Sequence, residues 1–432
     1  MLLIVIGLTV EIGGQIYAYL HPAYKVLPFA PDPFLGWRFI PNSEHIITGN
    51  HWYAREYSTT NKINSHGFRD FERKFKKNEN TIRIGLLGDS MIAAREVAFE
   101  KTAGQLLEKK LNKKLSHKTS KKYEVLNFGV PGYGVDQMYL NWDLIASKYN
   151  SDFLFIYMFE NNYFRTISPS WCQKGFFGLN YFGKPRCLRI RPFALIRKEE
   201  GEFIPKKMLQ NIPFDLYYIN LSHLKMFREL QNKNDINEFF SLLETLPLKV
   251  FPPAMNKQFV EEQNKYIKSK MNGKRMIKKE KKSFIIYIFS EIFDKLKKLS
   301  KTPKPKENIW EEIRYKGDSK NFPSWLTNNL VNLKLIQVLG NSVKQNKGQF
   351  IIIDTFKFYN RSTPPLDFSS EFLQNLSKFS NFGYIPLYNK LDNAKDNGTP
   401  VTWKYDPHLN ELGNEIFANA LFNYLEKKEI IN

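Results

Sequence analysis

Three short apolar runs place the strongest constraint on how this chain folds. They are TIRIGLLG (81–88), YEVLNFG (123–129) and DFLFIYMF (152–159). Continuous apolar runs of this length are typical of strands buried on both faces of a parallel sheet. Helices are predicted between them, near 97–114 and 135–148. The alternation of strands and helices predicts an α/β fold with a doubly wound sheet.

The same alternation returns in the last quarter of the chain. The pattern predicts a helix through 325–345, strands at 348–356 and 383–388, and a final helix near 410–428. We therefore expect one α/β domain over about 81–430. It is preceded by a lead-in segment, 21–80, whose aromatic-rich pieces have no helical period and look irregular or β-rich.

A mostly helical, Lys-rich insertion at about 165–320 interrupts this domain. Helical patterns occur near 221–247 and 258–270, and the run KRMIKKEKK (274–282) is dense in lysine. Residues 284–299 have apolar side chains at helical spacing and a basic end. They fit a cap helix packed on the domain better than a helix lying on a membrane surface, although both interpretations remain open.

The N-terminal segment, residues 1–20, is apolar almost throughout and is interrupted by Glu11 and Gln15. Its length is that of a membrane-spanning helix, but a mid-span glutamate is costly and no basic n-region precedes it. An uncleaved transmembrane anchor, a signal segment and a buried helix are all compatible with the pattern. We favour the single-pass membrane anchor, with the following domain on the extracytoplasmic side.

The chain is strongly basic, with 64 Lys and Arg against 43 Asp and Glu and a net charge of +21. Neither zinc-finger spacing nor an RNA-recognition signature is present, so we expect no nucleic acid and favour an anionic surface or envelope polymer. Cys172 and Cys187 form no CxxC pair. They would form one disulfide outside the cytosol and stay free thiols inside it. We expect no metal or other cofactor.

Gly88-Asp89-Ser90 follows the first predicted strand. In doubly wound sheets the ligand site lies at the carboxyl ends of the strands, and a helix N-terminus there offers unpaired N–H groups. A serine hydroxyl becomes a nucleophile when a base such as imidazole takes its proton. His408, in YDPHLNELGN (405–414), is the candidate base. Ser90 is equally compatible with a helix cap.

Four segments taken together resemble the signature segments of the SGNH hydrolases, also called GDSL esterases. They are GLLGDSM (85–91), NFGVPGYGVDQ (127–137), MFENN (158–162) and YDPHLNELGN (405–414), in the family's order. The resemblance implies a flavodoxin-like three-layer sandwich, with Ser90 as nucleophile and His408 as general base. It also implies an oxyanion hole made by the backbone N–H groups of Ser90 and Gly132 and the side-chain amide of Asn161.

The chain departs from the family pattern at two places. The family's aspartate usually stands three residues before the histidine, where this chain has Tyr405; Asp406 stands two before. Either Asp406 or a main-chain carbonyl therefore orients the imidazole as the third catalytic group. In the third segment Asn161 aligns with the oxyanion asparagine, and Asn162 is an adjacent competitor.

NSHGFR (64–69) resembles a segment found ahead of the serine in membrane-anchored bacterial members of the family. His66 and Arg69 either line the site or tie the lead-in to the sheet, and we favour the second interpretation. The expected function is a serine esterase acting on an ester or O-acylated substrate. One alternative is an O-acyltransferase modifying an envelope polysaccharide or lipid. The other is a non-catalytic envelope protein that binds an anionic polymer.

Overall fold

The computed structural model describes most of the chain outside the insertion. The described residues are 2–20, 28–32, 34–49, 56–166, 324–359 and 367–427, with short pieces at 170–171, 189–190, 193–195, 229–230, 235–246, 248–251, 261 and 275–276.

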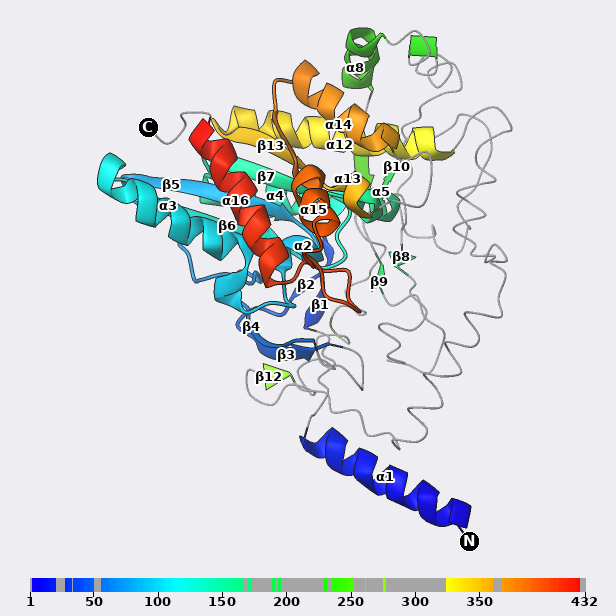
Figure 1. The fold of residues 1–432 in the computed structure, drawn as a ribbon. Helices are drawn as coiled ribbons and strands as arrows, with labels where there is room; N and C mark the ends of the chain where they lie inside the picture. The colour runs from blue at the N-terminus through cyan, green and yellow to red at the C-terminus, as the bar shows by residue number, and fades with distance from the viewer. Residues whose placement is uncertain are drawn as a thin grey trace.

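A five-stranded parallel sheet forms the centre of the domain (Figure 1). Its strands are β5 (Thr81–Gly88), β6 (Lys122–Gly129), β7 (Phe153–Met158), β13 (Gln349–Asp354) and β14 (Gly383–Pro386). The spatial order is β14-β13-β7-β5-β6. Counted in chain order this is 2-1-3-4-5, the flavodoxin-like doubly wound order. The predicted sheet type and topology are confirmed.

Alternate side chains of each strand enter two different cores. In β7, Leu154, Ile156 and Met158 belong to one buried cluster, whereas Phe155 and Tyr157 belong to the other. Both faces are covered, so no face of the strand needs polar residues. This is why the strands appear in the sequence as continuous apolar runs.

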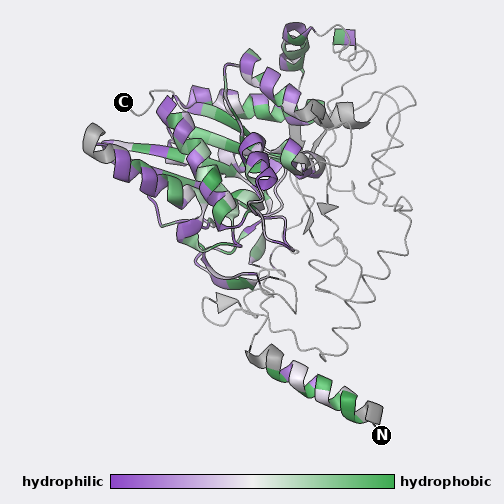
Figure 2. Ribbon diagram, viewed as in Figure 1, coloured by the Kyte–Doolittle hydropathy of each residue, from purple (hydrophilic) through white to green (hydrophobic). Residues whose placement is uncertain are grey.

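Helices cover both faces of the sheet and complete a three-layer sandwich. Side chains of α3 (Ala103–Thr119), α15 (Leu387–Asp396) and α16 (Glu411–Lys427) pack in one core. Side chains of α4 (Val135–Leu144), α12 (Ser324–Gln345) and α14 (Asp367–Phe379) pack in the other. Figure 2 shows apolar residues concentrated on the strands and polar residues on the outer faces of the helices.

Two predicted helices differ from the structure in their ends. The region near 97–114 begins with a 3-10 turn at Phe99–Lys101 before α3, and the region 135–148 ends in a 3-10 turn at Ala146–Tyr149 after α4. The short helices α2 (Ser90–Ala93), α5 (Glu160–Thr166) and α13 (Phe356–Tyr359) each follow a strand of the sheet. The sequence patterns did not predict α14 or α15.

The lead-in consists of two antiparallel hairpins. One pairs β1 (Phe29–Asp32) with β2 (Gly36–Phe39), and the other pairs β3 (Glu44–Thr48) with β4 (Ser58–Lys62). The two-residue strand β12 (Arg275–Met276) adds to β3 in parallel. Lead-in aromatics share the core of the sheet: the centroids of the Phe68 and Phe128 rings lie 5.2 Å apart.

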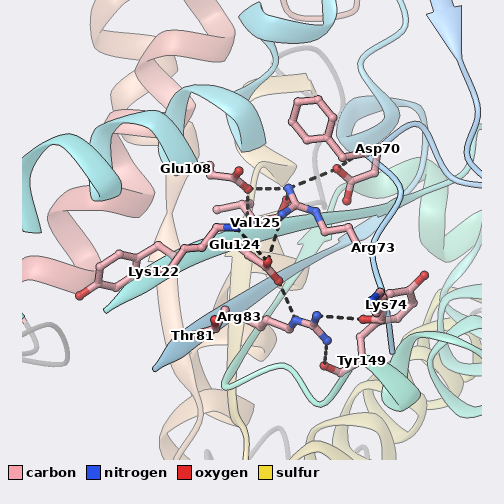
Figure 3. A network of polar contacts seen from close by, with 12 residues as sticks. Asp70, Arg73, Lys74, Thr81, Arg83, Glu108, Lys122, Glu124, Val125 and Tyr149 are labelled. Atoms are coloured by element: carbon pink, nitrogen blue, oxygen red, sulfur yellow. Dashed lines mark hydrogen bonds and ion pairs between the residues drawn. The ribbon is translucent and has the colours of Figure 1, made fainter. Parts of the chain in front are cut away.

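Buried ion pairs fasten the end of the lead-in to the amino ends of the strands (Figure 3). Arg83 donates to Glu124 Oε2 at 2.9 Å and to the carbonyls of Lys74 and Tyr149, each at 2.9 Å. Arg73 Nη2 lies 2.6 Å from Glu108 Oε2. Because these charged groups are buried, their pairing with one another is what makes their burial tolerable.

The described part of the insertion includes helix α8 (Ile236–Thr245) and short strands. The strands are β8 (Ser170–Trp171), β9 (Arg189–Ile190), β10 (Phe193–Leu195) and β11 (Lys249–Phe251). Helix α8 falls inside the predicted helical region 221–247. Cys172, Cys187, the 284–299 segment and most of 258–282 lie outside the described residues.

The N-terminal apolar segment forms helix α1 (Leu2–Leu20). Among the described helices, none combines the length and the apolar character needed to cross a membrane.

Candidate active site

Ser90 lies where β5 ends, as the first residue of α2. The helix cap is the residue before it: Asp89 Oδ1 accepts a hydrogen bond from the Met91 N–H at 3.1 Å. The capping role open to Ser90 on sequence is therefore held by Asp89. Gly88 permits the close approach of α2, because a Cβ there would meet Ile92 Cγ1 at 2.5 Å. Ser90 remains partly exposed.

Gly132 lies in the turn that follows β6. Its φ of 84° is in the left-handed region, where glycine avoids the strain of a side chain. Trp37 of the lead-in holds both neighbours of this glycine. Its Nε1 donates to the Pro131 carbonyl at 3.0 Å, and its carbonyl accepts from the Tyr133 hydroxyl at 2.7 Å. The turn is thereby fixed from outside the sheet.

Two adjacent asparagines follow β7, and the structure separates their roles. Asn162 is fully buried; its Oδ1 accepts from the Phe159 N–H at 2.9 Å and its Nδ2 donates to the Tyr133 carbonyl at 3.1 Å. Asn161 is exposed. Since the amide of Asn162 is used in holding two loops together, Asn161 is the better candidate for an oxyanion donor.

His408 and Asp406 lie in the turn before α16. Asp406 Oδ1 accepts from the His408 backbone N–H at 3.0 Å and also contacts His408 Nδ1. A spacing of two residues therefore brings the carboxylate to the imidazole, although the family usually has three. With Nδ1 engaged by Asp406, Nε2 is the ring nitrogen left for a nucleophile.

The imidazole of His408 lies among negative charges. Glu96 Oε1 is 3.9 Å from Nδ1. Burial favours the neutral ring, but the charge of Glu96, the hydrogen bond and charge of Asp406 and the charge of Asp89 outweigh it and raise the pKa of His408 to about 9. Asp89 and Glu96 stand on either side of Ser90 in the sequence, so His408 lies close to the Ser90 segment.

The carboxyl of Asp406 is held in its ionised form. Burial acts to raise its pKa, but the hydrogen bonds and charge of His408 and the hydrogen bond from Tyr57 outweigh burial and hold the pKa below its usual range. The third group of a catalytic triad must be ionised, because its negative charge stabilises the imidazolium that forms when the histidine takes a proton. Asp406 meets this requirement.

No family model matches the chain, and no curated protein matches it. Among solved structures, it is similar to a protein described as a GDSL-like lipase from Parabacteroides merdae, with 11% identity, 83% of this chain and 100% of that chain covered, and a TM-score of 0.38. It is also similar to an acetylxylan esterase from Geobacillus stearothermophilus (9% identity, 80% and 94% covered, TM-score 0.36) and to an acetyl xylan esterase (12%, 79% and 98%, 0.35). Sequence identities and TM-scores this low assign no chemistry to the chain. Any such assignment depends on the geometry of its own residues.

Arg69 and His66 belong to the connection between lead-in and sheet. Arg69 is fully buried and donates to the backbone carbonyls of residues 93, 94 and 97, at the end of α2 and in the loop after it. His66 packs against Phe75 and Tyr149, with ring centroids 4.5 and 5.8 Å away. These contacts agree with the favoured interpretation, in which the two residues tie the lead-in to the domain.

Sequence reasoning missed two residues that face the candidate site. Tyr57 donates its hydroxyl to Asp406 Oδ2 at 2.7 Å, and Glu96 faces His408. Tyr57 is separated from Asp406 by 349 positions, and no local pattern signals such a contact. Glu96 follows Ser90 by only six positions, so a carboxylate close after the candidate serine was a usable signal.

Proposed function

We propose that the chain is a serine esterase of the SGNH type that hydrolyses O-acyl esters. The observation that carries the proposal is the pairing of His408 Nδ1 with Asp406. The same imidazole lies close to Glu96 and Asp89, which flank Ser90 in the sequence. A base with a fixed tautomer next to a serine at a helix N-terminus is the arrangement that activates a hydroxyl.

The proposed reaction has two halves. Ser90 Oγ attacks the ester carbonyl carbon while His408 Nε2 takes the hydroxyl proton. The tetrahedral intermediate then expels the alcohol, which leaves with that proton, and an acyl-enzyme remains. Water attacks the acyl carbon, gives its proton to His408, and releases a carboxylic acid as Ser90 Oγ recovers a proton.

The oxyanion of each tetrahedral intermediate would be held by three donors, the Ser90 and Gly132 N–H groups and the Asn161 amide. Two features support this assignment. Gly132 has no side chain of its own to cover its N–H and adopts a left-handed turn, and Asn161 is exposed while Asn162 is engaged elsewhere. Preorganised donors of this kind supply much of the rate enhancement in acyl transfer.

The proposed substrate is an O-acylated glycan or lipid of the cell envelope. The net charge of +21 favours an anionic polymer or surface over a neutral one. We also propose that α1 attaches the domain to a membrane. Its exposed side chains include Val5, Ile6, Leu8, Ile12 and Ile16. Carbonate extraction of membranes from cells making the full chain would test attachment, and full release into the wash would contradict it.

Labelling with a fluorophosphonate probe tests the catalytic proposal. The full-length wild type is compared with Ser90→Ala, His408→Ala and the control Ser147→Ala, whose serine lies in the turn at the amino end of β7. We expect labelling in wild type and Ser147→Ala, and its loss in the other two variants. A folded wild type that is not labelled, or equal labelling of Ser90→Ala, would contradict the proposal.

A further inference from the structure

Arg165 joins three segments that carry the proposed oxyanion donors. It lies in α5, four residues after Asn161. Its Nη1 is 2.5 Å from Asp89 Oδ2 and 3.2 Å from the Tyr133 carbonyl oxygen. Asp89 directly precedes Ser90, and Tyr133 directly follows Gly132. One guanidinium nitrogen therefore connects the ends of β5 and β6 to the helix that follows β7.

The contact with Asp89 is between buried groups. The Asp89 side chain has no exposed surface, and that of Arg165 is 15% exposed. A carboxylate buried to this degree needs a cationic or hydrogen-bonding partner for each oxygen. The Met91 N–H serves Oδ1 and Arg165 serves Oδ2. Without the guanidinium, Asp89 would carry an uncompensated charge immediately beside Ser90.

Two further contacts restrict how Arg165 and its partners can move. The guanidinium lies over the Phe159 ring, 5.5 Å from its centroid. The Tyr133 carbonyl that it binds also accepts from Asn162 Nδ2, the neighbour of Asn161. The guanidinium of Arg165 and the carbonyl of Tyr133 are therefore each held by a second contact. A network in which every group has more than one partner favours a single arrangement of its loops.

We propose that Arg165 is a positioning residue that sets the relative placement of the Ser90, Gly132 and Asn161 donors. This inference rests on the proposed esterase function. In this proposal Arg165 acts through its contacts with Asp89 and the Tyr133 carbonyl. Oxyanion donors act only when they lie at hydrogen-bond distance from one developing charge, so a small displacement of any of the three segments costs rate.

The positive charge of Arg165 has a second effect at the same place. A bare Asp89 carboxylate would repel the negative charge that develops on the substrate oxygen in the transition state. It would also act on His408, which is faced by Asp406 and Glu96 in addition to Asp89. The ion pair with Arg165 offsets the negative charge of Asp89 in both respects.

The test compares Arg165→Met with Arg165→Lys in the full-length protein. The readouts are kcat and KM for p-nitrophenyl acetate and the pH dependence of kcat/KM. We expect Arg165→Met to lower kcat roughly 10- to 100-fold, below the effect of deleting an oxyanion donor, with KM changed less than about threefold. Its acid limb should move to higher pH. Arg165→Lys should restore most of kcat, because a single ammonium can replace the single nitrogen that makes both contacts.

If Arg165→Met does not fold, Asp89→Asn is compared with the double variant Asp89→Asn/Arg165→Met, which has no bare buried carboxylate; if Arg165→Met folds, the same variants complete a double-mutant cycle. If Arg165 acts through Asp89, Arg165→Met adds little to the loss already caused by Asp89→Asn. If the fold-loss of kcat in the double variant equals the product of the losses in Asp89→Asn and Arg165→Met, the inference is overturned. An Arg165→Met enzyme with wild-type kcat and pH profile would also overturn it. An active wild type with inactive Ser90→Ala and unchanged Arg165→Met refutes only this inference, whereas an active Ser90→Ala refutes the proposed function.

Discussion

The hydroxyl of Tyr57 donates a hydrogen bond to Oδ2 of Asp406, at 2.7 Å, across 349 positions of the chain. The preceding residue strengthens the connection: the Glu56 carboxylate accepts from the backbone N–H groups of Lys404 and Tyr405, at 2.5 and 2.9 Å. The ring of Tyr57 also packs on Trp403, with centroids 5.3 Å apart. Two consecutive lead-in residues therefore hold the loop that carries the proposed acid and base, and the lead-in is part of the candidate site.

Replacing Tyr57 by phenylalanine should slow the enzyme while leaving it folded. The change removes one hydrogen bond from the carboxylate that orients His408. We expect kcat for p-nitrophenyl acetate to fall roughly 5- to 30-fold and the free energy of unfolding by about 1 kcal/mol. Steady-state kinetics and urea unfolding measure the two effects. Tyr139→Phe on α4 is the matched control, and equal kcat values for the two variants would contradict the assigned role.

Glu96 should control the pH dependence of activity. The general base must be neutral, so a His408 pKa near 9 predicts that kcat/KM rises with pH through an apparent pKa above the ordinary 6.5. Glu96→Gln removes the charge but keeps the shape, and should lower that apparent pKa. Glu100→Gln, at an exposed position four residues later, is the control. An unchanged acid limb in Glu96→Gln would show that Glu96 does not act on the imidazole.

Stability should follow the same titration. A histidine whose pKa is raised in the folded protein stabilises that state fully below about pH 6.5, and this contribution is lost as pH rises through about 9. The loss amounts to at most about 3 kcal/mol for a shift of this size. Unfolding free energies measured in urea from pH 6 to 9.5 should fall more steeply in wild type than in His408→Gln. Parallel curves would argue against the raised pKa.

Alanine at the two adjacent asparagines should separate catalysis from stability. Asn161→Ala removes an exposed amide, so we expect kcat to fall about 100- to 1000-fold with little change in Tm. Asn162→Ala leaves the buried Phe159 N–H without its acceptor and removes a donor to Tyr133, so the free energy of unfolding should fall by about 2–3 kcal/mol. Kinetics and thermal melts of both variants test this. The reverse assignment of effects would make Asn162 the oxyanion donor.

Arg83 should matter for stability alone. Arg83→Met removes the nearest ion-pair partner of the buried Glu124 carboxylate and the donor to several backbone carbonyls, so we expect a loss of about 3–5 kcal/mol in guanidinium unfolding. Fluorophosphonate labelling per folded molecule should not change. Lys122→Met removes an exposed partner of the same carboxylate, 3.7 Å away, and should cost less than about 1 kcal/mol. Similar losses in the two variants would contradict a special role for the buried pair.

The strands were accessible from sequence because their physical signal is local, whereas the flavodoxin-like strand order was expected from the family resemblance. β5, β6 and β7 are buried on both faces, so each appears as an uninterrupted apolar run. Helix α14 has no uninterrupted apolar run. Its apolar residues are spaced as on one face of a helix, and this spacing is clear only once the ends of the helix are known. The four segments carrying Ser90, Gly132, Asn161 and His408 were also readable, since each follows a strand or precedes a helix at the carboxyl side of the sheet.

The sequence by itself determined the strands of the sheet, its doubly wound class and the residue types available at its carboxyl edge. Only the tertiary structure decided which contacts these side chains make. It brought Asp406 to His408 despite the short spacing, engaged Asn162 and left Asn161 exposed. It also added partners from distant segments, namely Tyr57 to Asp406 and Arg165 to Asp89. Strand formation depends on neighbouring residues, whereas the position and charge of a catalytic group depend on every segment that packs around it.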